Sequence, residues 1–278
     1  MRGKTVVITG ATSGIGAVAA RRLAEQGARI VIVARDRQRA DATLRELRAV
    51  SAQQAHTAFY ADLSRLSEMK RVAAEIAAAE PKIDVLMNNA GLVSARNSKT
   101  EDGLGLMFAV NHLSYFVLSN LLLGPLRAAG GARIVSTASD AHRRARLDFD
   151  RLQEQTGMTG YGTTKLCNIL FTRELARRIS GTGVTANCLH PGFVATRFGD
   201  NAGGALRAGI AVAKRLFALS PEEGAQTMVY LASAAEVAGR SGGYYERCAP
   251  SESTRAAQSD ADARRLWEVS VKIAGIGG

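Results

Sequence analysis

Short apolar runs alternate along this chain with longer segments in which apolar residues recur at helical spacing. Such alternation is typical of strand–helix–strand units that build a parallel sheet. Two of the runs, IVIVA from residue 30 and DVLMNNA from residue 84, are almost continuously apolar, as expected for strands buried on both faces. The pattern predicts an α/β protein with a doubly wound, mainly parallel sheet of seven strands. We expect these strands at residues 5–9, 29–34, 56–60, 83–87, 133–137, 184–189 and 243–245.

Helices are predicted to fill the intervals between the strands. No Pro/Ser-rich linker, low-complexity tract or fixed-period repeat interrupts the pattern, so residues 1–278 are predicted to form a single domain. In a doubly wound sheet, ligands bind beyond the carboxyl ends of the strands, where the strand order reverses. Residues that directly follow a strand are therefore the candidates for chemistry. The helices are expected to begin near Gly14, Asp36, Leu66, Gly103, Tyr161 and Pro221.

Two later segments depart from this regular alternation. The glycine-rich residues 196–219 are predicted to form either a mobile lid over the ligand pocket or a plain loop and surface helix. A C-terminal extension, residues 248–278, begins with a polar stretch at 248–262 that predicts a flexible excursion. It is expected to end in a short helix around Trp267, whose apolar residues lie at the spacing that indicates packing.

The basic charge of the chain does not indicate a nucleic-acid partner. The formal net charge is +11, but the arginines are scattered over helical faces with few aromatic residues between them. Only Arg143, Arg144 and Arg146 form a compact basic cluster, which predicts a solvated loop or, alternatively, a patch that steers an anionic substrate.

Membrane and metal partners are not expected either. No stretch reaches the roughly 18 uninterrupted apolar residues of a membrane span, so we expect a soluble cytoplasmic protein. Cys167, Cys188 and Cys248 are odd in number, widely spaced and outside any CxxC or Cys/His cluster. They predict reduced thiols and no metal site.

A glycine-rich turn, TGATSGIG from Thr9, follows the first predicted strand and opens a helix. Glycines there allow positive φ and close approach of a pyrophosphate, whose charge the helix amino end attracts. The spacing GxxxGxG differs from the common GxGxxG fingerprint, so a purely structural turn is an alternative. The candidate cofactor-binding residues of this turn are Gly10, Thr12, Ser13, Gly14, Ile15 and Gly16.

The end of the second predicted strand indicates which nicotinamide cofactor is bound. An acidic residue at this place, about 20 residues beyond the glycines, would accept from the ribose 2′-hydroxyl of NAD. Ala34 and Arg35 stand there instead, and a guanidinium suits the 2′-phosphate of NADP. Asp36 is either a helix cap or an argument against this interpretation. NADP(H) is therefore favoured over NAD(H).

Three further segments complete a recognisable set: Asn88-Asn89-Ala90-Gly91 after the fourth strand, Ser139 after the fifth, and Tyr161-x-x-x-Lys165. Together with TGATSGIG they resemble the short-chain dehydrogenase/reductase family, in the family's order and over nearly the whole chain. The resemblance implies a single Rossmann domain and an NADP(H)-dependent enzyme that moves a hydride between nicotinamide and a carbonyl or alcohol carbon of a small-molecule substrate.

Tyr161 and Lys165 are spaced so that positions i and i+4 share one helix face. A nearby ammonium favours phenolate, so the pKa of Tyr161 is expected to fall below about 10. Alone, this pair fits an ordinary surface helix. The resemblance implies that Ser139 binds the substrate oxygen, Tyr161 gives or takes its proton, Lys165 also holds the nicotinamide ribose, and Asn111 relays protons through water.

Further cofactor contacts are implied by the same resemblance. Asp62 and Leu63, after the third strand, are similar to the adenine-contacting pair, although Asp62 also suits a turn or helix cap. His112 and His190 are predicted to serve structure near the site, and His56 to be a satisfied strand residue. The other implied contacts are Asn89, Ala90 and Gly91 at one strand end, and Pro191, Gly192, Val194 and Thr196 beside the nicotinamide.

Substrate and assembly are only coarsely indicated. The long interval from Ser139 to Tyr161, with Asp140-Ala-His142, is similar to the retinol-dehydrogenase-like branch, which implies lipophilic or natural-product carbonyls and alcohols. The same four residues also serve reduction of a C=C bond or epimerisation of a carbinol, and a non-catalytic NADP(H) sensor is a further alternative. The family resemblance implies a homo-oligomer, and residues 110–126 suit either an interface helix or an internal one.

Overall fold

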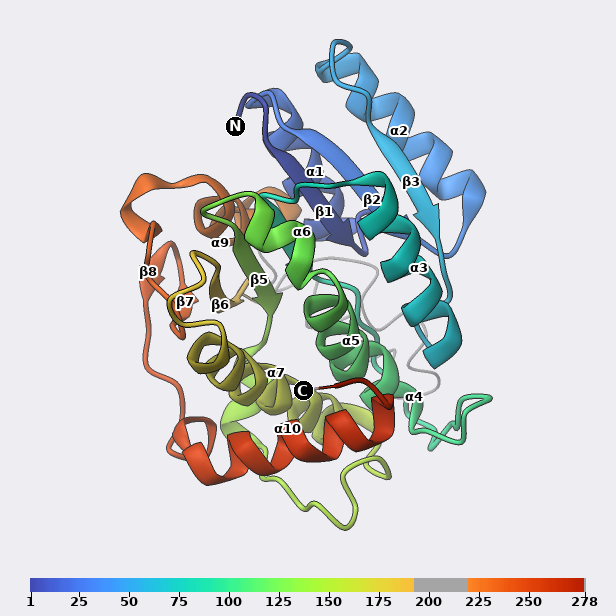
Figure 1. The fold of residues 1–278 in the computed structure, drawn as a ribbon. Helices are drawn as coiled ribbons and strands as arrows, with labels where there is room; N and C mark the ends of the chain where they lie inside the picture. The colour runs from blue at the N-terminus through green and yellow to red at the C-terminus, as the bar shows by residue number, and fades with distance from the viewer. Residues whose placement is uncertain (193–219, 278) are drawn as a thin grey trace.

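The computed structural model, which describes residues 1–192 and 220–277, has an α/β fold built on one eight-stranded sheet (Figure 1). The strand order is β3-β2-β1-β4-β5-β6-β7-β8; β1 to β7 run parallel and β8 is antiparallel to β7. The order reverses between β1 and β4, which is the ligand-binding edge of such sheets. The strands are β1 (Thr5–Thr9), β2 (Arg29–Ala34), β3 (Thr57–Tyr60), β4 (Val85–Asn88), β5 (Arg133–Thr137), β6 (Thr185–His190), β7 (Tyr244–Glu246) and β8 (Ala249–Pro250).

Helices cover both faces of the sheet, so alternate residues of each strand enter two separate cores. In β1, Val6 and Ile8 pack with α1, α2 and α9, whereas Val7 faces the core that contains α3, α5, α7 and α10. Burial on both faces explains the nearly continuous apolar runs. The helices are α1 (Gly14–Glu25), α2 (Arg37–Val50), α3 (Leu66–Ala79), α4 (Leu106–Phe108), α5 (Ser114–Leu121), α6 (Leu123–Ala128), α7 (Gly157–Arg178), α9 (Pro221–Ser233) and α10 (Asp260–Ala274).

Two predicted helix starts are displaced. The helix expected from Tyr161 is α7, which begins one turn earlier at Gly157, and the helix expected from Gly103 begins with α4 at Leu106. Between α4 and α5 the chain makes a π-helical turn, η1 (Ala109–Leu113). Single π turns inside helices occur frequently at functional sites, and this one contains Asn111.

The eighth strand was not predicted from the sequence. β7 and β8 are joined by Arg247 and Cys248, whose φ angles are 49° and 60°. Two-residue hairpin turns with positive φ normally carry Asn-Gly or a similar pair, so Arg-Cys gave no turn signal. The Cys248 backbone N–H donates to Thr227 Oγ1 at 3.1 Å, which holds the turn against α9. Cys167, Cys188 and Cys248 are all free thiols.

The polar stretch at 248–262 is ordered, which corrects the expected flexible excursion. It contains β8, the 3₁₀ turn η4 (Ala256–Gln258) and the start of α10. On α10, the Trp267 ring centroid lies 4.9 Å from that of Phe116 and 6.0 Å from that of Phe171, on α5 and α7. Residues 115–118 are fully buried beneath this cover, so segment 110–126 is largely internal.

Two other expectations concern membranes and the segment after β6. None of the described helices has the length and apolar character that crossing a bilayer requires. The expected lid at 196–219, together with Val194 and Thr196, lies outside the described residues.

His112 makes stability depend on pH. The imidazole is fully buried against Phe108 and bonds Ser270 Oγ through Nε2 at 2.9 Å, and burial lowers its pKa to about 3. The unfolded chain binds this proton below about pH 6.5 but the folded chain does not until about pH 3, so stability falls as pH falls through that window. We expect a loss of about 2 kcal/mol at pH 5 from this residue.

Urea unfolding between pH 5 and pH 7.5 measures this loss. His112→Gln, which retains a group at the position facing Ser270 but does not titrate, should show a correspondingly shallower pH dependence than the unchanged chain. Equal pH dependence in both proteins would rule out His112 as the source.

Candidate active site

The glycine-rich turn after β1 is held by polar contacts to the end of β4. The Thr9 hydroxyl accepts from the backbone N–H groups of Asn89 and Ala90 at 2.9 and 3.0 Å. The Asn89 side-chain amide donates to the carbonyls of Thr9 and Gly10, and its oxygen accepts from Thr137 Oγ1 at the end of β5. Asn89 therefore joins three neighbouring strand ends, in addition to its predicted place near the cofactor.

Glycine is required at two positions of this turn for different reasons. Gly10 has φ +68°, and a Cβ there would lie 2.9 Å from the Ala90 Cα. At Gly16, a Cβ would overlap the Gly10 carbonyl oxygen and lie 2.5 Å from Asn89 Nδ2. The turn is thus packed as tightly against helix and strand as a pyrophosphate-binding turn needs to be.

The amino end of α1 is arranged to receive an anion. Ser13 is the N-cap residue, and within the described chain its side chain makes no capping hydrogen bond to the helix. Thr12, Ser13, Gly14 and Ile15 are all partly exposed at this end. The free N–H groups and the helix dipole favour negative charge there.

Arg35 is exposed at the end of β2 and forms no ion pair with any described residue. Asp36 is the N-cap of α2: its Oδ1 accepts from the Arg39 backbone N–H at 3.1 Å. The acidic residue that complicated the cofactor interpretation is therefore engaged as a helix cap. Among the described residues, the guanidinium at this strand end has no ion-pair partner.

Asp62 follows β3 and forms a turn in which its Oδ1 accepts from the Ser64 N–H at 3.0 Å. Burial alone would raise the pKa of Asp62, but this hydrogen bond and the nearby Arg35 and Arg65 lower it overall. The carboxylate stays charged beside Arg35. Asp62 and the buried Leu63 thus lie at the same edge as the end of β2, as the adenine assignment requires.

Lys165 and Tyr161 lie one turn apart on α7, both buried. Lys165 Nζ donates to the Thr137 carbonyl at 2.9 Å and lies 5.4 Å from the centre of the Tyr161 ring. It is also close to the end of β4, because a Cβ on Gly91 would lie 3.6 Å from Nζ. The ammonium is therefore held among the ends of β4 and β5 and the phenol.

The prediction that the pKa of Tyr161 falls below its ordinary value is wrong. Burial raises the pKa of the phenol above its ordinary value of 10, and a hydrogen bond with Ser139 only partly opposes this. Burial also lowers the pKa of Lys165 from 10.5 to about 7, which weakens the charge that was expected to stabilise phenolate. Desolvation outweighs the pair attraction here, so Tyr161 is a protonated phenol at neutral pH.

Asn111 is fixed by the π turn η1 with its amide toward the end of β4. Its Oδ1 accepts from the Leu92 N–H, and its Nδ2 donates to the Leu92 carbonyl, each at 2.8 Å. Nδ2 also donates to Thr164 Oγ1, on α7, at 3.1 Å. Asn111 is therefore within the same cluster as Lys165, with Gly91 between them.

Ser139 lies in the loop two residues after the end of β5 and is the N-cap of the 3₁₀ turn η2 (Asp140–Arg144). Its hydroxyl accepts from the Ala141 N–H at 3.2 Å. Around Tyr161, a small apolar cluster separate from the two main cores contains Leu92, Val93, Met107 and Ala141. The phenol therefore meets Ser139 in a surrounding that is largely apolar.

Other predicted residues have the following places. His190 ends β6, beside the partly exposed Pro191 and Gly192. His56 is buried one residue before β3, and its Nδ1 accepts from the Ile30 N–H at 3.0 Å. Its Nε2 is buried without a hydrogen-bond partner among the described residues, so the predicted satisfied strand residue is only partly correct. Arg143 pairs with Asp140, whereas Arg144 and Arg146 are exposed. The solvated-loop interpretation suits the latter two.

Sequence reasoning missed three residues that support the site. Thr137 supplies the carbonyl that holds Lys165, and Asn168 donates to the same carbonyl from α7 at 3.2 Å. His142 bonds the Ser139 carbonyl through Nδ1 at 2.7 Å. His142 could have been predicted from the sequence, because it is a histidine three residues after a serine at a strand end. Thr137 could not, because it contributes a backbone carbonyl, which every residue has.

A doubly wound fold with a glycine-rich phosphate turn and a Ser-Tyr-Lys-Asn cluster at its switch point defines a nicotinamide-dependent oxidoreductase. Residues 4–205 match the family model described as short chain dehydrogenase. The chain belongs to the short-chain dehydrogenase/reductase family, whose members use NAD(P)(H) and act on alcohol or carbonyl groups.

Similar proteins span nearly the whole chain. Human retinol dehydrogenase 14 is 40% identical over 299 residues, covering 99% of this chain and 88% of the relative. A crystal structure of an uncharacterized protein from Mycobacterium paratuberculosis is 30% identical with a TM-score of 0.79, covering 99% and 94% of the two chains. An active-site complex of Pseudomonas aeruginosa RhlG with NADP is 26% identical with a TM-score of 0.71, covering 88% and 94%.

Proposed function

We propose that this protein is an NADP(H)-dependent reductase and dehydrogenase of small lipophilic carbonyls and alcohols. The observation that carries the proposal is the convergence of Ser139, Tyr161, Lys165 and Asn111 beside the glycine-rich turn. These four come from the loop after β5, from α7 and from η1, so only the folded chain brings them together.

The preference for NADP(H) rests on charge at the end of β2. Arg35 is an exposed guanidinium there without an ion pair to any described residue, and Asp36 is engaged as a helix cap. A 2′-phosphate suits this guanidinium better than an unmodified ribose does. The amino end of α1 would hold the pyrophosphate, Asp62 and Leu63 the adenine, and Lys165 the nicotinamide ribose. The RhlG structure in complex with NADP is consistent with this preference.

The residues divide the work of carbonyl reduction among them. The hydride would come from NADPH when it is bound. Ser139, whose hydroxyl oxygen accepts from the Ala141 N–H, would donate a hydrogen bond to the substrate oxygen and stabilise the charge that develops there. Tyr161, protonated because burial raises its pKa, gives its proton to the same oxygen. Lys165 and Asn111 lie where a proton returning to Tyr161 would pass.

The lipophilic substrate class rests on the surroundings of Tyr161. Leu92, Val93, Met107 and Ala141 form the apolar cluster around the phenol, and they offer no charged group to a substrate. Such a wall favours an apolar substrate whose carbonyl alone meets polar groups. The retinol dehydrogenases among the similar proteins support the same class.

An assay of the purified chain tests this function. NADPH and NADH oxidation would be followed with lipophilic aldehydes, ketones and enones, and the products identified by mass spectrometry. We expect alcohols from aldehydes or ketones, with NADPH as the better cofactor. Saturated ketones from enones would instead show C=C reduction, and cofactor binding without turnover of any substrate would favour a non-catalytic sensor.

Arg35 provides a separate test of the cofactor preference. Arg35→Asp replaces the charge that suits a 2′-phosphate by one that repels it, so KM for NADPH should rise by about tenfold or more. KM for NADH should fall or stay constant. Arg39→Asp, on the exposed first turn of α2, is the matched control for charge alone. An unchanged ratio of the two KM values in Arg35→Asp would contradict the assignment.

A further inference from the structure

The peptide group that joins Ser139 to Asp140 is held at both polar atoms by histidine side chains. His142 Nδ1 lies 2.7 Å from the Ser139 carbonyl oxygen, within η2. His190 Nδ1, at the end of β6, lies 3.3 Å from the Asp140 nitrogen and accepts from its N–H. Two imidazoles from different elements thus fix one peptide plane, immediately after Ser139.

The partners require opposite tautomers of the two rings. His142 Nδ1 faces a carbonyl, so it carries a proton and donates, and its Nε2 accepts from the Thr254 N–H at 3.4 Å. His190 Nδ1 faces an N–H, so it carries no proton, and the ring proton is on Nε2. Each ring is therefore neutral, with every nitrogen assigned one role.

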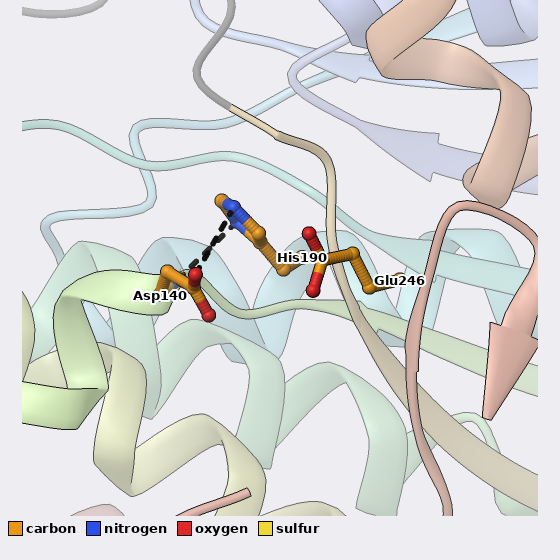
Figure 2. Close-up of side chains that lie close together, drawn as sticks. All are labelled: Asp140, His190 and Glu246. Carbon is orange, nitrogen blue, oxygen red and sulfur yellow. Dashed lines mark hydrogen bonds and ion pairs between the residues drawn. The ribbon is translucent and has the colours of Figure 1, made fainter. Parts of the chain in front are cut away.

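Nearby carboxylates favour a proton on His190 Nε2. Asp140 Oδ2 lies 3.8 Å from His190 Nε2, and a carboxylate oxygen of Glu246 lies within 4.8 Å of a ring nitrogen of His190 (Figure 2). Glu246 pairs in register with His190 across β6 and β7, which directs both side chains to one face of the sheet. Asp140 is itself anchored, because Oδ1 accepts from Arg143 Nε at 2.9 Å and Tyr244 Oη at 3.1 Å.

Burial supports the neutral state of both rings. His142 is fully buried and His190 is 9% exposed. Burial lowers the pKa of each, and Arg143 lowers both further; Asp140 opposes both shifts, and Glu246 opposes that of His190. A protonated His190 would set a second N–H against the Asp140 N–H and break their hydrogen bond.

The three groups Asp140, His190 and Glu246 could also be read as ligands of a cation. A metal on His190 Nε2 needs the lone pair at that atom, which moves the ring proton to Nδ1. There it would oppose the Asp140 N–H, and Arg143 already neutralises the Asp140 carboxylate. The geometry favours a proton, and not a metal, on Nε2.

We propose that His142 and His190 are positioning residues for Ser139: as neutral rings of opposite tautomer, they hold the Ser139–Asp140 peptide and thereby the direction of the Ser139 hydroxyl. A single turn connects this peptide to the Ser139 hydroxyl. The same turn places the Ala141 N–H 3.2 Å from Ser139 Oγ, so a tilt of the peptide moves the donor that orients the hydroxyl. This inference rests on the role given to Ser139 under the proposed function.

Paired substitutions separate positioning from space filling. Asparagine retains a polar atom near the δ position of either ring, which faces the Ser139–Asp140 peptide. Glutamine retains one near the ε position, which faces elsewhere. For both histidines, the Asn variant should keep kcat within about threefold of the unchanged protein, whereas the Gln variant should lose about tenfold, the size of one positioning hydrogen bond. KM for NADPH should stay constant in all four.

A space-filling role predicts the opposite order, because glutamine is closer to histidine in size. Decanal and NADPH are suitable probes for the assay. His56→Gln is the matched control: it removes a buried Nδ1 acceptor far from Ser139, so it should lower stability and leave kcat unchanged. Equal or better activity of the Gln variants at positions 142 and 190 would overturn the proposal.

Two further readouts distinguish failure of this inference from failure of the proposed function. In a Ser139→Ala background, His190→Gln should cost no additional activity, because the positioned group is absent; an undiminished cost would refute positioning through Ser139. Nitrogen NMR of the four histidines reports the tautomers without any substrate. We expect His142 protonated at Nδ1 and His190 at Nε2, and the same tautomer in both would also overturn the proposal, whatever the assay shows.

Discussion

Tyr161→Phe is expected to lower kcat by about 10²–10⁴-fold, because it removes the general acid while leaving the ring in place. Tyr161 is 8% exposed and packs with Val93 and Met107, and phenylalanine fills the same space. The folded state should lose the hydrogen bond with Ser139, about 1 kcal/mol. NADPH affinity, measured by fluorescence titration, should change little. The measurement is single-turnover reduction of an aldehyde that the unchanged protein accepts.

Tyr115→Phe is the matched control for this prediction. Tyr115 is fully buried, and its ring centre lies 5.6 Å from Lys165 Nζ, almost as near as that of Tyr161. Its hydroxyl, however, donates to the Ala90 carbonyl at 3.0 Å. We expect this variant to lose stability and to keep most of its kcat. Wild-type turnover in Tyr161→Phe would end the proposed mechanism.

Gly16→Ala should weaken NADPH binding by about tenfold to a hundredfold, because the added methyl group forces 1–3 kcal/mol of strain into the cofactor turn. The Cβ would overlap the Gly10 carbonyl oxygen and press on Asn89 Nδ2. Both atoms belong to the structure that ties β1 to β4, so the turn must open or shift. Fluorescence titration with NADPH and thermal unfolding measure the two effects.

Gly124→Ala provides the control, since Gly124 lies in α6 and a Cβ there meets nothing within 4 Å. It should leave NADPH affinity unchanged and raise the free energy of unfolding by up to about 1 kcal/mol, because alanine is the better helix former. If Gly16→Ala bound NADPH as tightly as Gly124→Ala, the close approach of helix and strand would not matter for the cofactor.

Much of the fold could be predicted from local patterns, and the errors have physical causes. Strands such as IVIVA could be predicted, because burial on both faces of the sheet requires continuous apolar residues. The eighth strand could not be predicted, because its turn residues, Arg247 and Cys248, adopt positive φ although neither is the Asn, Asp or Gly usual in such turns. The polar stretch at 248–262 looked flexible because its order comes from contacts with α7 and α9, which lie far away in sequence.

At the candidate site, the residues could also be predicted from the sequence, but their charge states could not. Each of Ser139, Tyr161 and Lys165 could be named from a motif, because each follows a strand or shares a helix face. Their electrostatics could not: the spacing of Tyr161 and Lys165 predicted a lowered phenol pKa, whereas burial raises it. Desolvation depends on every atom packed around a group, and a pair of residue numbers does not contain that information.

The sequence by itself determined the doubly wound sheet, the family and the basic residue at the end of β2, because strand burial, helix spacing and strand-end motifs are local properties of the chain. The four candidate site residues followed from the family resemblance. Only the tertiary structure decided the charge states at the site and the pairing of His142 with His190 around one peptide. These depend on groups brought together from β5, β6 and α7, whose proximity exists only after the chain has folded.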